Sequence, residues 1–521
     1  MFLGDIPRRN AFRHPEQMAL EDDDRTLTWL DLNRRINRLC AGLTRLGLRK
    51  GDRLGVLSIP SIEVVETYFA AAKLGLVIVP VHTGLVDSEV KFLLDDVEAA
   101  AVIVDTDRAA AFGHVLTGLS NRIAVGGHDR FFSYEDLLEG MGEVEPEVRM
   151  DESDLFAIRF TSGTTGRPKG CPSTHRDWIQ RSLNFLAHIN HSHKDRALLL
   201  SPLSLGVGSS VLMTYSLVGA SMVISPRFDA SRVLKKIESA KITTFMVPVP
   251  TLFGRLLDDP AFDRTDLSSL RVVGYGGAVF PVELLVRTLE RFPCRFFGVY
   301  GHLEAGGFST YLMPDDHRIE GLSHSEREKR IEHMRSCGRE ALQADVRITD
   351  EDGLELPHGE VGEMVVRTEG MVADYWKRPG EIEKVLRDGW FRTGDAASID
   401  SDGYVYISDR IKDVVRTGGM NVSSVEVESV LLAHAAVADA AVIGIPDPRW
   451  GESLTAVVVA SCNPDAAIEE SILAHCREQL ANYKVPKKVK FIETLPKNSM
   501  GKVLKRELRL FYTGTEKVTS T

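Results

Sequence analysis

The sequence predicts an α/β protein with a large N-terminal domain of layered α/β sheets and a smaller α+β C-terminal domain. Over most of the 521 residues, short apolar segments alternate with amphipathic helical segments, which is the pattern of parallel sheets covered by helices. Near residue 411 the pattern changes to short strands and two amphipathic helices, which end in a basic tail. With 43% hydrophobic and 26% charged residues, the chain can bury the core that such domains need.

The first elements follow one another in regular order. Residues 28–46 carry apolar side chains three and four positions apart, which predicts a helix that ends at Gly47. Behind this helix, alternating strands and helices are expected at 53–58, 62–75, 76–81, 88–99 and 100–105. The first half of the large domain is therefore predicted to form one parallel sheet with helices on its faces.

A second series of buried strands predicts a second layered sheet. These strands are expected at 196–203, 220–226, 241–250 and 270–278. The polar stretch 313–335 predicts a solvated surface segment without chemistry. The two helices of the smaller domain are expected at 423–434 and 466–480.

Composition and charge exclude several classes of function. The formal net charge of −11 is spread without long blocks of one sign, which argues against a nucleic-acid partner. The six cysteines are scattered and form no CxxC pair, so neither structural zinc nor a disulfide framework is expected. No apolar run is long enough for a leader or a transmembrane segment. We expect a cytoplasmic protein, and a homodimer is compatible with the sequence.

The segment TSGTTGRPKG at 161–170 offers parts for a phosphate clamp. It differs from a P-loop, because Pro168 lacks the amide hydrogen of a phosphate cradle and Gly170 lacks the hydroxyl that holds magnesium. Several hydroxyl groups, two glycines and Lys169 remain available for a mobile polyphosphate clamp, and a surface turn is the alternative reading. The segment GYGGAV likewise misses the dinucleotide-binding pattern at Val279.

The string FTSGTTGRPKGCPSTH at 160–175 closely resembles the signature of the adenylate-forming superfamily, which includes acyl-CoA synthetases, nonribosomal adenylation domains and luciferases. Five further segments resemble the family in the same order: GYGGAVFP (274–281), VYGHLEA (299–305), GWFRTGD (389–395), SDRIKDVVRTGGMNVSSVEVE (408–428) and PKNSMGKVLKREL (496–508). The resemblance covers nearly the entire chain. It implies an ATP-dependent carboxylate–CoA ligase, which forms an acyl-adenylate with release of pyrophosphate and then a thioester with release of AMP.

The resemblance also implies the cofactors and the residues that bind the nucleotide. ATP, Mg²⁺ and coenzyme A are expected, together with a small-molecule carboxylic acid. Lys169, Glu304 and Lys502 would be catalytic, and Glu304 and Thr161 would hold the metal ion. The residues expected to bind ATP or AMP are Thr161, Ser162, Gly163, Thr164, Thr165, Gly166, Gly276, Gly277, Ala278, Tyr300, Gly301, Asp395 and Arg410.

Other residues are assigned to the thiol step and to domain movement. Gly418 and Gly419 would open a tunnel for pantetheine, and Trp450 resembles a residue of the thioester stage. Lys412 matches the hinge about which the small domain swings. The resemblance therefore implies a mobile C-terminal domain of residues 412–521 behind an N-terminal domain of residues 1–411.

The acyl pocket is expected from Leu205, Gly208, Ser209, His302, Gly306 and Gly307. Three departures from the family pattern lie at or near the predicted site. Leu303 replaces a threonine that contacts the α-phosphate, Gly298 replaces an amide side chain, and PLSLGVG at 202–208 lacks the aromatic residue and histidine that are common there. No aspartate that could pair with an amino acid's amine is present in this segment. Two alternatives remain: an adenylating enzyme that loads a carrier protein, and a weakly active or non-catalytic nucleotide-binding relative.

Overall fold

The computed structural model describes residues 2–161, 168–247, 249–417, 420–497 and 503–513. The chain divides into two compact units. Within the described ranges, unit 1 comprises residues 2–346 and 366–391, and unit 2 comprises residues 347–365 and 392–513. The predicted boundary between residues 411 and 412, with a hinge near Lys412, stays a prediction.

Unit 1 contains a nine-stranded sheet whose central strands run parallel. Its order is β16 (Arg339–Glu340), β15 (Gly307–Leu312), β14 (Arg295–His302), β13 (Val272–Gly276), β12 (Thr244–Val247), β10 (Arg196–Leu199), β11 (Ser221–Ile224), β1 (Met18–Glu21) and β2 (Thr26–Thr28). The strands from β14 to β1 pair in parallel, whereas β15, β16 and β2 add antiparallel edges. The second predicted sheet is therefore present.

A seven-stranded sheet forms the other layer of unit 1. Its order is β7 (Phe132–Ser133), β6 (Asn121–Val125), β5 (Ala101–Asp105), β3 (Arg53–Leu57), β4 (Val77–Pro80), β8 (Leu155–Phe160) and β9 (Gly170–Thr174). All neighbours pair in parallel except β8 and β9, which pair antiparallel and flank the TSGTTGRPKG segment.

The main core of unit 1 lies where helices pack between the two sheets. Helices α2 (Trp29–Arg45), α3 (Ile62–Leu74), α7 (His175–His188) and α8 (Gly206–Val218) bury apolar side chains against strands of both sheets. The predicted helix α2 begins at Thr28, whose side chain accepts a hydrogen bond from the Asp31 amide while Asp31 caps the Thr28 amide. Helices α1 (Asp5–Arg13) and α6 (Tyr134–Leu138) complete this side.

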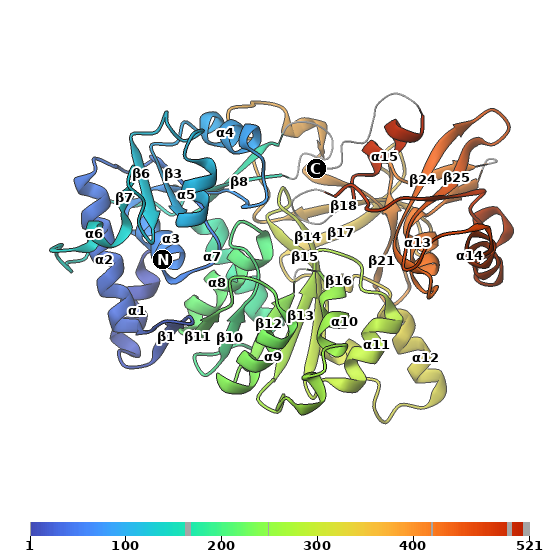
Figure 1. Cartoon of the computed structure of the whole chain (residues 1–521), viewed down its shortest axis with the longest axis horizontal. Coiled ribbons are helices and arrows are strands. Elements are labelled where there is room, and N and C mark those ends of the chain that lie inside the picture. Colours follow the sequence, from blue (N-terminus) through green and yellow to red (C-terminus); the bar gives the residue numbers. More distant parts are fainter. Residues whose placement is uncertain (1, 162–167, 248, 418–419, 498–502, 514–521) are drawn as a thin grey trace. The chain divides into compact units, whose positions relative to one another are not determined.

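Further helices cover the outer faces of unit 1. Helices α9 (Ala230–Ser239), α10 (Thr251–Leu257) and α11 (Val282–Arg291) pack on β10, β12 and β13, in front of the strands in Figure 1. Helices α4 (Asp87–Asp96) and α5 (Thr106–Phe112) cover the seven-stranded sheet. The predicted surface stretch contains α12 (His324–His333), whose residues are mostly exposed.

Two smaller sheets follow along the chain. One has the order β17 (Ala344–Thr349), β18 (Gly362–Thr368), β20 (Trp390–Ile399) and β19 (Leu386–Arg387), with β21 (Val405–Arg410) on β20. The other has the order β23 (Met420–Val422), β22 (Val415–Thr417), β25 (Gly451–Ala460) and β24 (Val437–Asp447), with β26 (Lys488–Phe491) on β25.

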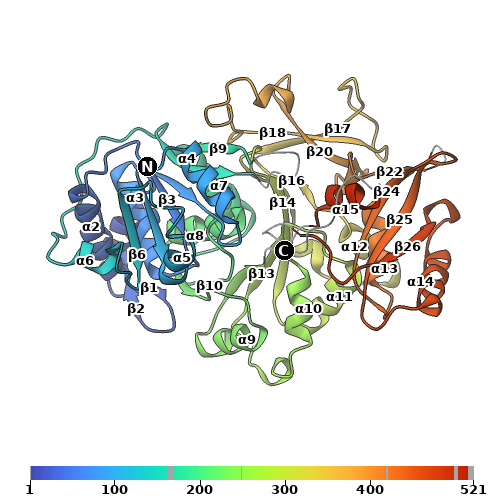
Figure 2. The same ribbon diagram turned by 45° about the horizontal axis from the view of Figure 1, so that its top comes forward.

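Helices pack on both faces of the β24–β25 sheet in unit 2. Helices α13 (Ser424–Leu432) and α14 (Ala466–Gln479) bury apolar side chains on one face, and α15 (Lys505–Tyr512) packs on the other. Figure 2 shows β24, β25 and β26 side by side, with α15 and α14 to either side. The predicted combination of a large layered α/β part and a smaller α+β part is confirmed. Within the described ranges, no helix has both the length and the apolarity needed to traverse a bilayer.

Candidate functional site

Lys169 lies directly before strand β9, at the end of the segment that the sequence predicts to clamp phosphates. The predicted clamp residues Ser162, Gly163, Thr164, Thr165 and Gly166 lie outside the described residues. At the base of the loop, the Thr161 amide donates to the Lys169 carbonyl oxygen at 3.0 Å, and the Lys169 amide donates to Thr161 Oγ1 at 3.3 Å. These two hydrogen bonds continue the pairing of β8 with β9 and hold both residues at the end of the sheet.

The ammonium group of Lys169 contacts a carboxylate and an aromatic ring. Its Nζ lies 2.8 Å from Glu381 Oε2 and 4.6 Å from the centroid of the Tyr375 ring. The hydroxyl of Tyr375 donates to Glu304 Oε1 at 3.4 Å. The hydrogen bond from Lys169 lowers the pKa of Glu381, whereas burial and the charge of Glu304 raise the pKa of Tyr375. Tyr375 therefore contacts both Lys169 and Glu304, the two described residues that are predicted to be catalytic.

Glu304 lies in the turn between the antiparallel strands β14 and β15. The Gly306 amide donates to the Leu303 carbonyl oxygen at 3.1 Å, and the Val372 amide donates to the Glu304 carbonyl oxygen at 2.9 Å. Gly306 has a φ of 80°, and a Cβ there would come within 2.0 Å of the Gly370 carbonyl oxygen. Because backbone contacts fix this turn, the Glu304 side chain starts from a defined position.

Leu303, which replaces the threonine of the family pattern, packs against an apolar cluster. This cluster consists of Cys171, Val372, Tyr375 and Ile382. An aliphatic side chain suits these neighbours, whereas a hydroxyl group buried among them would need a hydrogen-bond partner. The departure at Leu303 therefore has a packing reason, and its effect on the α-phosphate stays a prediction.

The carboxyl ends of the parallel strands β13 and β14 expose small residues. Gly277 and Ala278 follow β13, Gly301 lies near the end of β14, and all three are exposed. Gly276 is buried, and a Cβ at this position would come within 2.8 Å of the Val299 carbonyl oxygen. In open α/β sheets, ligands bind at the carboxyl ends of the strands. The structure thus brings the small residues predicted for the nucleotide site to one edge of the nine-stranded sheet.

Tyr300 and His302 contact each other at the end of β14. The Tyr300 hydroxyl lies 2.8 Å from His302 Nε2, and the two rings meet edge to face with centroids 5.3 Å apart. The His302 ring also lies 5.5 Å from the ring of Phe391. These contacts orient the Tyr300 ring, which is predicted to stack on adenine.

The position of Gly298, where the family often has an amide side chain, lies against a tyrosine ring. A Cβ at Gly298 would come within 2.9 Å of Tyr275 Cε2.

The Tyr275 hydroxyl lies 2.8 Å from His317 Nε2, and His317 Nδ1 lies 2.9 Å from the Met313 carbonyl oxygen. Because a carbonyl oxygen only accepts, Nδ1 carries the proton and Nε2 accepts from Tyr275. Burial lowers the pKa of His317 to about 4.

We expect His317 to make the free energy of unfolding depend on pH. Its pKa is about 4 in the folded protein, against about 6.5 in an unfolded chain. Between these values the unfolded state binds more protons. The contribution of His317 is therefore fully present above about pH 6.5 and falls by up to about 3 kcal/mol as the pH drops toward 4. Urea unfolding at pH values across this window measures the change.

The variant His317→Gln should lose less stability than the native sequence when the pH is lowered. His324→Gln is the control, because the His324 side chain is 89% exposed. If all three proteins lost the same stability over this window, His317 would not be the titrating group.

A pocket in unit 1 lies beside the turn that carries Glu304. About 470 Å³ of space free of protein atoms, open solvent included, lies in this pocket. Its wall is formed by Gln180, Arg181, Asn184, Phe185, Ser210, Ala305, Gly306, Gly307, Phe308, Tyr311, Gln343, Thr368, Glu369 and Gly370. Gly306 and Gly307, which were predicted for the acyl site, belong to this wall. The other residues predicted for the acyl site do not line it: Leu205, Gly208, Ser209 and His302.

Gly208 is closely packed against the segment that precedes its helix. A Cβ there would come within 2.3 Å of the Pro202 carbonyl oxygen and 2.7 Å of the Ser201 carbonyl oxygen. We expect Gly208→Ala to lower the free energy of unfolding by about 1–3 kcal/mol, because α8 must shift away from this segment. Urea unfolding at neutral pH measures the loss.

Gly206→Ala on the same helix is the matched control. A Cβ at Gly206 would approach only Arg159 Nη1, at 3.6 Å, so this substitution should leave stability unchanged or raise it slightly. Equal unfolding midpoints for the two variants would contradict the packing role of Gly208.

The sequence patterns do not indicate that helix α7 forms a wall of this pocket. Gln180, Arg181 and Asn184 lie on it at helical spacing, shortly behind the phosphate motif. Polar residues at this spacing usually mark a solvated helix face, so the local pattern gave only a weak signal. Phe308, Tyr311 and Gln343 belong to the same wall but come from distant segments, and no local pattern connects them with α7.

In unit 2, Asp395 and Arg410 form an ion pair across neighbouring strands. They are register partners on β20 and β21, and Arg410 Nε lies 2.7 Å from Asp395 Oδ1. Arg410 Nη1 also donates to the Thr393 carbonyl oxygen at 3.1 Å. The Asp395 side chain is only 6% exposed. The structure thus places side by side the two residues predicted to bind ribose.

The residues predicted for the hinge and the thiol step are only partly described. Lys412 is exposed and follows β21. Trp450 is 38% exposed, and its ring centroid lies 4.7 Å from Arg449 Cζ and 5.7 Å from Lys487 Nζ. The remaining predicted residues, Gly418, Gly419 and Lys502, lie outside the described residues.

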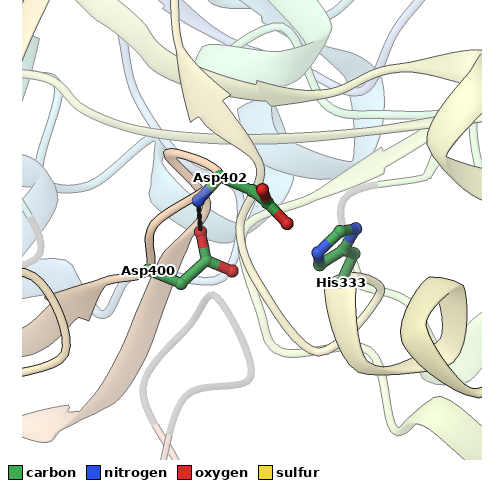
Figure 3. Close-up of side chains that lie close together, drawn as sticks. All are labelled: His333, Asp400 and Asp402. Atoms are coloured by element: carbon green, nitrogen blue, oxygen red, sulfur yellow. Dashed lines mark hydrogen bonds between the residues drawn. The ribbon is translucent and has the colours of Figure 1, made fainter.

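Figure 3 shows two aspartates of the turn that follows β20. The Asp402 amide donates to Asp400 Oδ1 at 2.9 Å, which stabilises this turn. The third residue drawn, His333, ends helix α12 and belongs to unit 1. The three residues therefore do not form a site within one unit, and we assign no metal ion to them.

Family profiles and individual proteins of one family match nearly the whole chain. The family profile of the AMP-binding enzymes matches residues 7–376, and that of the AMP-binding enzyme C-terminal domain matches residues 426–502. A feruloyl-CoA synthase from Amycolatopsis sp. is 35% identical over 509 residues, which cover 97% of this chain and 98% of that protein. The long-chain-fatty-acid–CoA ligase FadD13 of Mycobacterium tuberculosis is 33% identical over 509 residues, covering 98% and 96% of the two chains.

A solved structure agrees with these relatives. The crystal structure of the anthranilate CoA ligase AuaEII in complex with anthranoyl-AMP matches 98% of this chain and 96% of its own, with a TM-score of 0.87 and 28% sequence identity. The large profile covers most of unit 1, including Lys169, Glu304 and Tyr375, and the smaller profile lies within unit 2. The chain therefore belongs to the family of AMP-binding enzymes, the adenylate-forming proteins that its sequence motifs resemble.

Proposed function

We propose that the protein is an ATP-dependent carboxylate–CoA ligase. In the first step, a carboxylate oxygen of the acid attacks the α-phosphorus of ATP, the bond to the β-phosphate bridging oxygen breaks, and pyrophosphate leaves. In the second step, the coenzyme A thiolate attacks the acyl carbon, the bond to the AMP oxygen breaks, and AMP leaves. The two relatives described above are named as a CoA synthase and a CoA ligase, which confirms the predicted class of AMP-forming acid–thiol ligase.

The observation that carries this proposal is the contact of Tyr375 with both Lys169 and Glu304. The ring lies 4.6 Å from Lys169 Nζ, and the hydroxyl donates to Glu304 Oε1 at 3.4 Å. Transfer of an adenylyl group needs positioning and neutralisation of phosphate charge more than a protein nucleophile, because the substrates supply nucleophile and leaving group. The ion pair with Glu381 holds the lysine at the site, and the pyrophosphate that forms would compete for it.

The donor set fits a magnesium ion on the phosphates of ATP. Glu304 offers a carboxylate and Thr161 a hydroxyl oxygen, and Mg²⁺ prefers hard oxygen ligands, usually one or two carboxylates together with substrate phosphates. A metal ion bound there would neutralise phosphate charge. Glu304 would hold the ion, while Lys169 stabilises the oxygens of the departing pyrophosphate.

Unit 2 contributes groups for the ribose and for the thiol step. Asp395 would accept hydrogen bonds from the ribose hydroxyls, and its ion pair with Arg410 orients the carboxylate. Trp450 presents an exposed ring next to Arg449 and Lys487, which suits a flat, anionic ligand such as the nucleotide part of coenzyme A. Lys502 is proposed as the lysine that bridges carboxylate and α-phosphate, on its sequence motif alone.

Incubation with ATP, Mg²⁺, coenzyme A and a panel of fatty, cyclic and aromatic acids tests the proposal. We expect AMP and an acyl-CoA thioester in equal amounts, measured by mass spectrometry. Pyrophosphate exchange without a CoA thioester would instead favour transfer of the acyl group to a carrier protein. ATP binding without exchange for any acid would favour a non-catalytic nucleotide-binding protein.

A further inference from the structure

Several polar atoms in the wall of the pocket in unit 1 lack a hydrogen-bond partner. Among the described residues, nothing accepts from Arg181 Nε or Nη1, and the buried Asn184 Oδ1 and the Tyr311 hydroxyl are also unpaired. Buried polar groups are nearly always hydrogen-bonded in folded proteins, and a charged group without a partner is the most costly kind. Three unpaired residues in one wall therefore point to a ligand that supplies the missing partners.

The charge of Arg181 is not neutralised by the described part of the chain. No carboxylate in the described ranges lies within ion-pair distance of it, and its Nη2 makes only a long hydrogen bond of 3.5 Å to the Gly370 carbonyl oxygen. On the same helix, the negative charge of Asp177 acts on Arg181. The Asp177 carboxylate already accepts a hydrogen bond from the Thr174 amide, as part of the capping box at the start of α7. Burial lowers the pKa of Arg181 to about 10, and the charge of Asp177 compensates for only part of the lost hydration.

A second arginine adds to the positive charge behind the wall. Arg159 is 5% exposed, and its Cζ lies 4.7 Å from the centroid of the Trp178 ring. Arg181 Cζ lies 5.5 Å from the same centroid. Arg159 likewise forms no ion pair within the described residues, and the charge of each arginine acts on the other in a poorly solvated region. An anion in the pocket would be attracted by both charges.

The rest of the wall limits the shape and charge of the ligand. The rings of Phe185, Phe308 and Tyr311 lie within 6.4 Å of one another and form an apolar side. The side-chain amide of Gln343 donates from Nε2 to Gln180 Oε1 at 3.0 Å, so these two side chains already have one hydrogen bond with each other. Glu369 is exposed and lies beyond ion-pair distance of Arg181. The wall thus combines an apolar side with a cationic patch.

We infer that the acyl pocket of this enzyme selects carboxylic acids that carry a second carboxylate, which the Arg181 guanidinium binds while the first carboxylate is adenylated. The inference rests on the proposed ligase function and names its class of substrate. Ala305, Gly306 and Gly307 of the wall directly follow Glu304, which connects the pocket with the proposed site of adenylation. A guanidinium group binds a carboxylate through two neighbouring N–H groups that point the same way. Arg181 offers such a pair as Nε or Nη1 together with Nη2, whose hydrogen bond to the Gly370 carbonyl oxygen is long.

Pairs of acids that differ only in the second charge test this inference. Adipate is compared with its monomethyl ester, and terephthalate with its monomethyl ester. With the native sequence we expect kcat/KM for the diacid to exceed that for the ester by at least about tenfold. Binding of the same acids in the presence of a non-hydrolysable ATP analogue, measured by calorimetry, should show the same order without requiring turnover.

Two substitutions on α7 assign the selectivity to one side chain. Arg181→Met keeps the length and apolar bulk of the side chain, so it should abolish the preference for the diacid or reverse it, with kcat/KM for the monoester preserved or raised. Arg176→Met on the same helix is the matched control, because Arg176 is exposed and pairs with Glu152. This control should keep the native preference. Arg181→Lys should retain part of the preference because it keeps the charge.

The outcomes separate this inference from the proposed function. Equal binding of diacid and ester to the native protein, or an unchanged preference in Arg181→Met, would overturn the inference even if thioesters form. Selective binding of the diacid that is lost in Arg181→Met would support it even if no thioester forms, and the proposed ligase function would then fail by itself. The comparison within the native protein needs no variant, so a folding defect in Arg181→Met cannot obscure the result.

Discussion

Replacing Glu304 by glutamine is expected to slow acid-dependent pyrophosphate exchange by about 100- to 1000-fold, the loss typical of a removed group that stabilises transition-state charge. The variant keeps the shape of the side chain and can still accept a hydrogen bond from Tyr375, which lies 3.4 Å away. What it loses is the negative charge that would hold a magnesium ion on the phosphates. Initial rates of exchange at saturating ATP and Mg²⁺ measure the effect.

Glu383→Gln is the control for this prediction. Glu383 is exposed and lies close to the segment that carries Tyr375 and Glu381, so it tests whether loss of any carboxylate in this region matters. Native exchange rates are expected for it. A Glu304→Gln variant with more than about a tenth of the native rate would exclude the proposed charge role, since such a loss corresponds to less than about 1.4 kcal/mol.

The second large effect is expected from Asp395→Asn, which should raise the Kd for ATP by about 10- to 100-fold. Hydrogen bonds to a charged group contribute about 1.5–3 kcal/mol each, and the variant weakens those to the ribose hydroxyls as well as the ion pair with Arg410. The Asp395 side chain is 6% exposed, so bulk water does not replace these interactions. Calorimetry with ATP measures the change in affinity.

Asp352→Asn serves as the comparison, because Asp352 is an exposed acidic residue of the same unit. It should bind ATP with native affinity. The variant Arg410→Met separates the two roles of Asp395. If the ion pair only orients the carboxylate, Arg410→Met should weaken binding less than Asp395→Asn does. Native affinity in Asp395→Asn would remove this residue from the proposed ribose site.

Local sequence patterns predicted the layers of the fold well, because they depend on interactions between near neighbours. The helix α2 follows from its apolar spacing and its cap at Thr28, and the parallel strands follow from short apolar segments between helices. Motif resemblance likewise predicts roles for Lys169 and Glu304, both of which contact Tyr375 in the structure. Their closest partners in the structure, Tyr375 and Glu381, could not be found in this way, because the contact depends on how distant segments fold together.

The proposed acyl pocket shows the same limit more clearly. The sequence predicts it from Leu205, Gly208, Ser209, His302, Gly306 and Gly307, of which Gly306 and Gly307 belong to the wall described above. Gly208 instead packs against Pro202, and the Ser209 hydroxyl donates to the Leu205 carbonyl oxygen within its own helix. Arg181, by contrast, has the appearance of an ordinary surface residue in sequence. The packing of α7 against β15 and the segment around Gly370 shields Nε and Nη1 of its guanidinium from water.

The composite wall of this pocket has a consequence for redesign. Its residues come from five separate stretches, at 180–185, 210, 305–311, 343 and 368–370. Exchanging any single stretch with that of a relative would leave the remaining four unchanged. A transplant of substrate preference therefore has to move α7 together with β15 and the segment around Gly370, and the most economical first step is the single position Arg181.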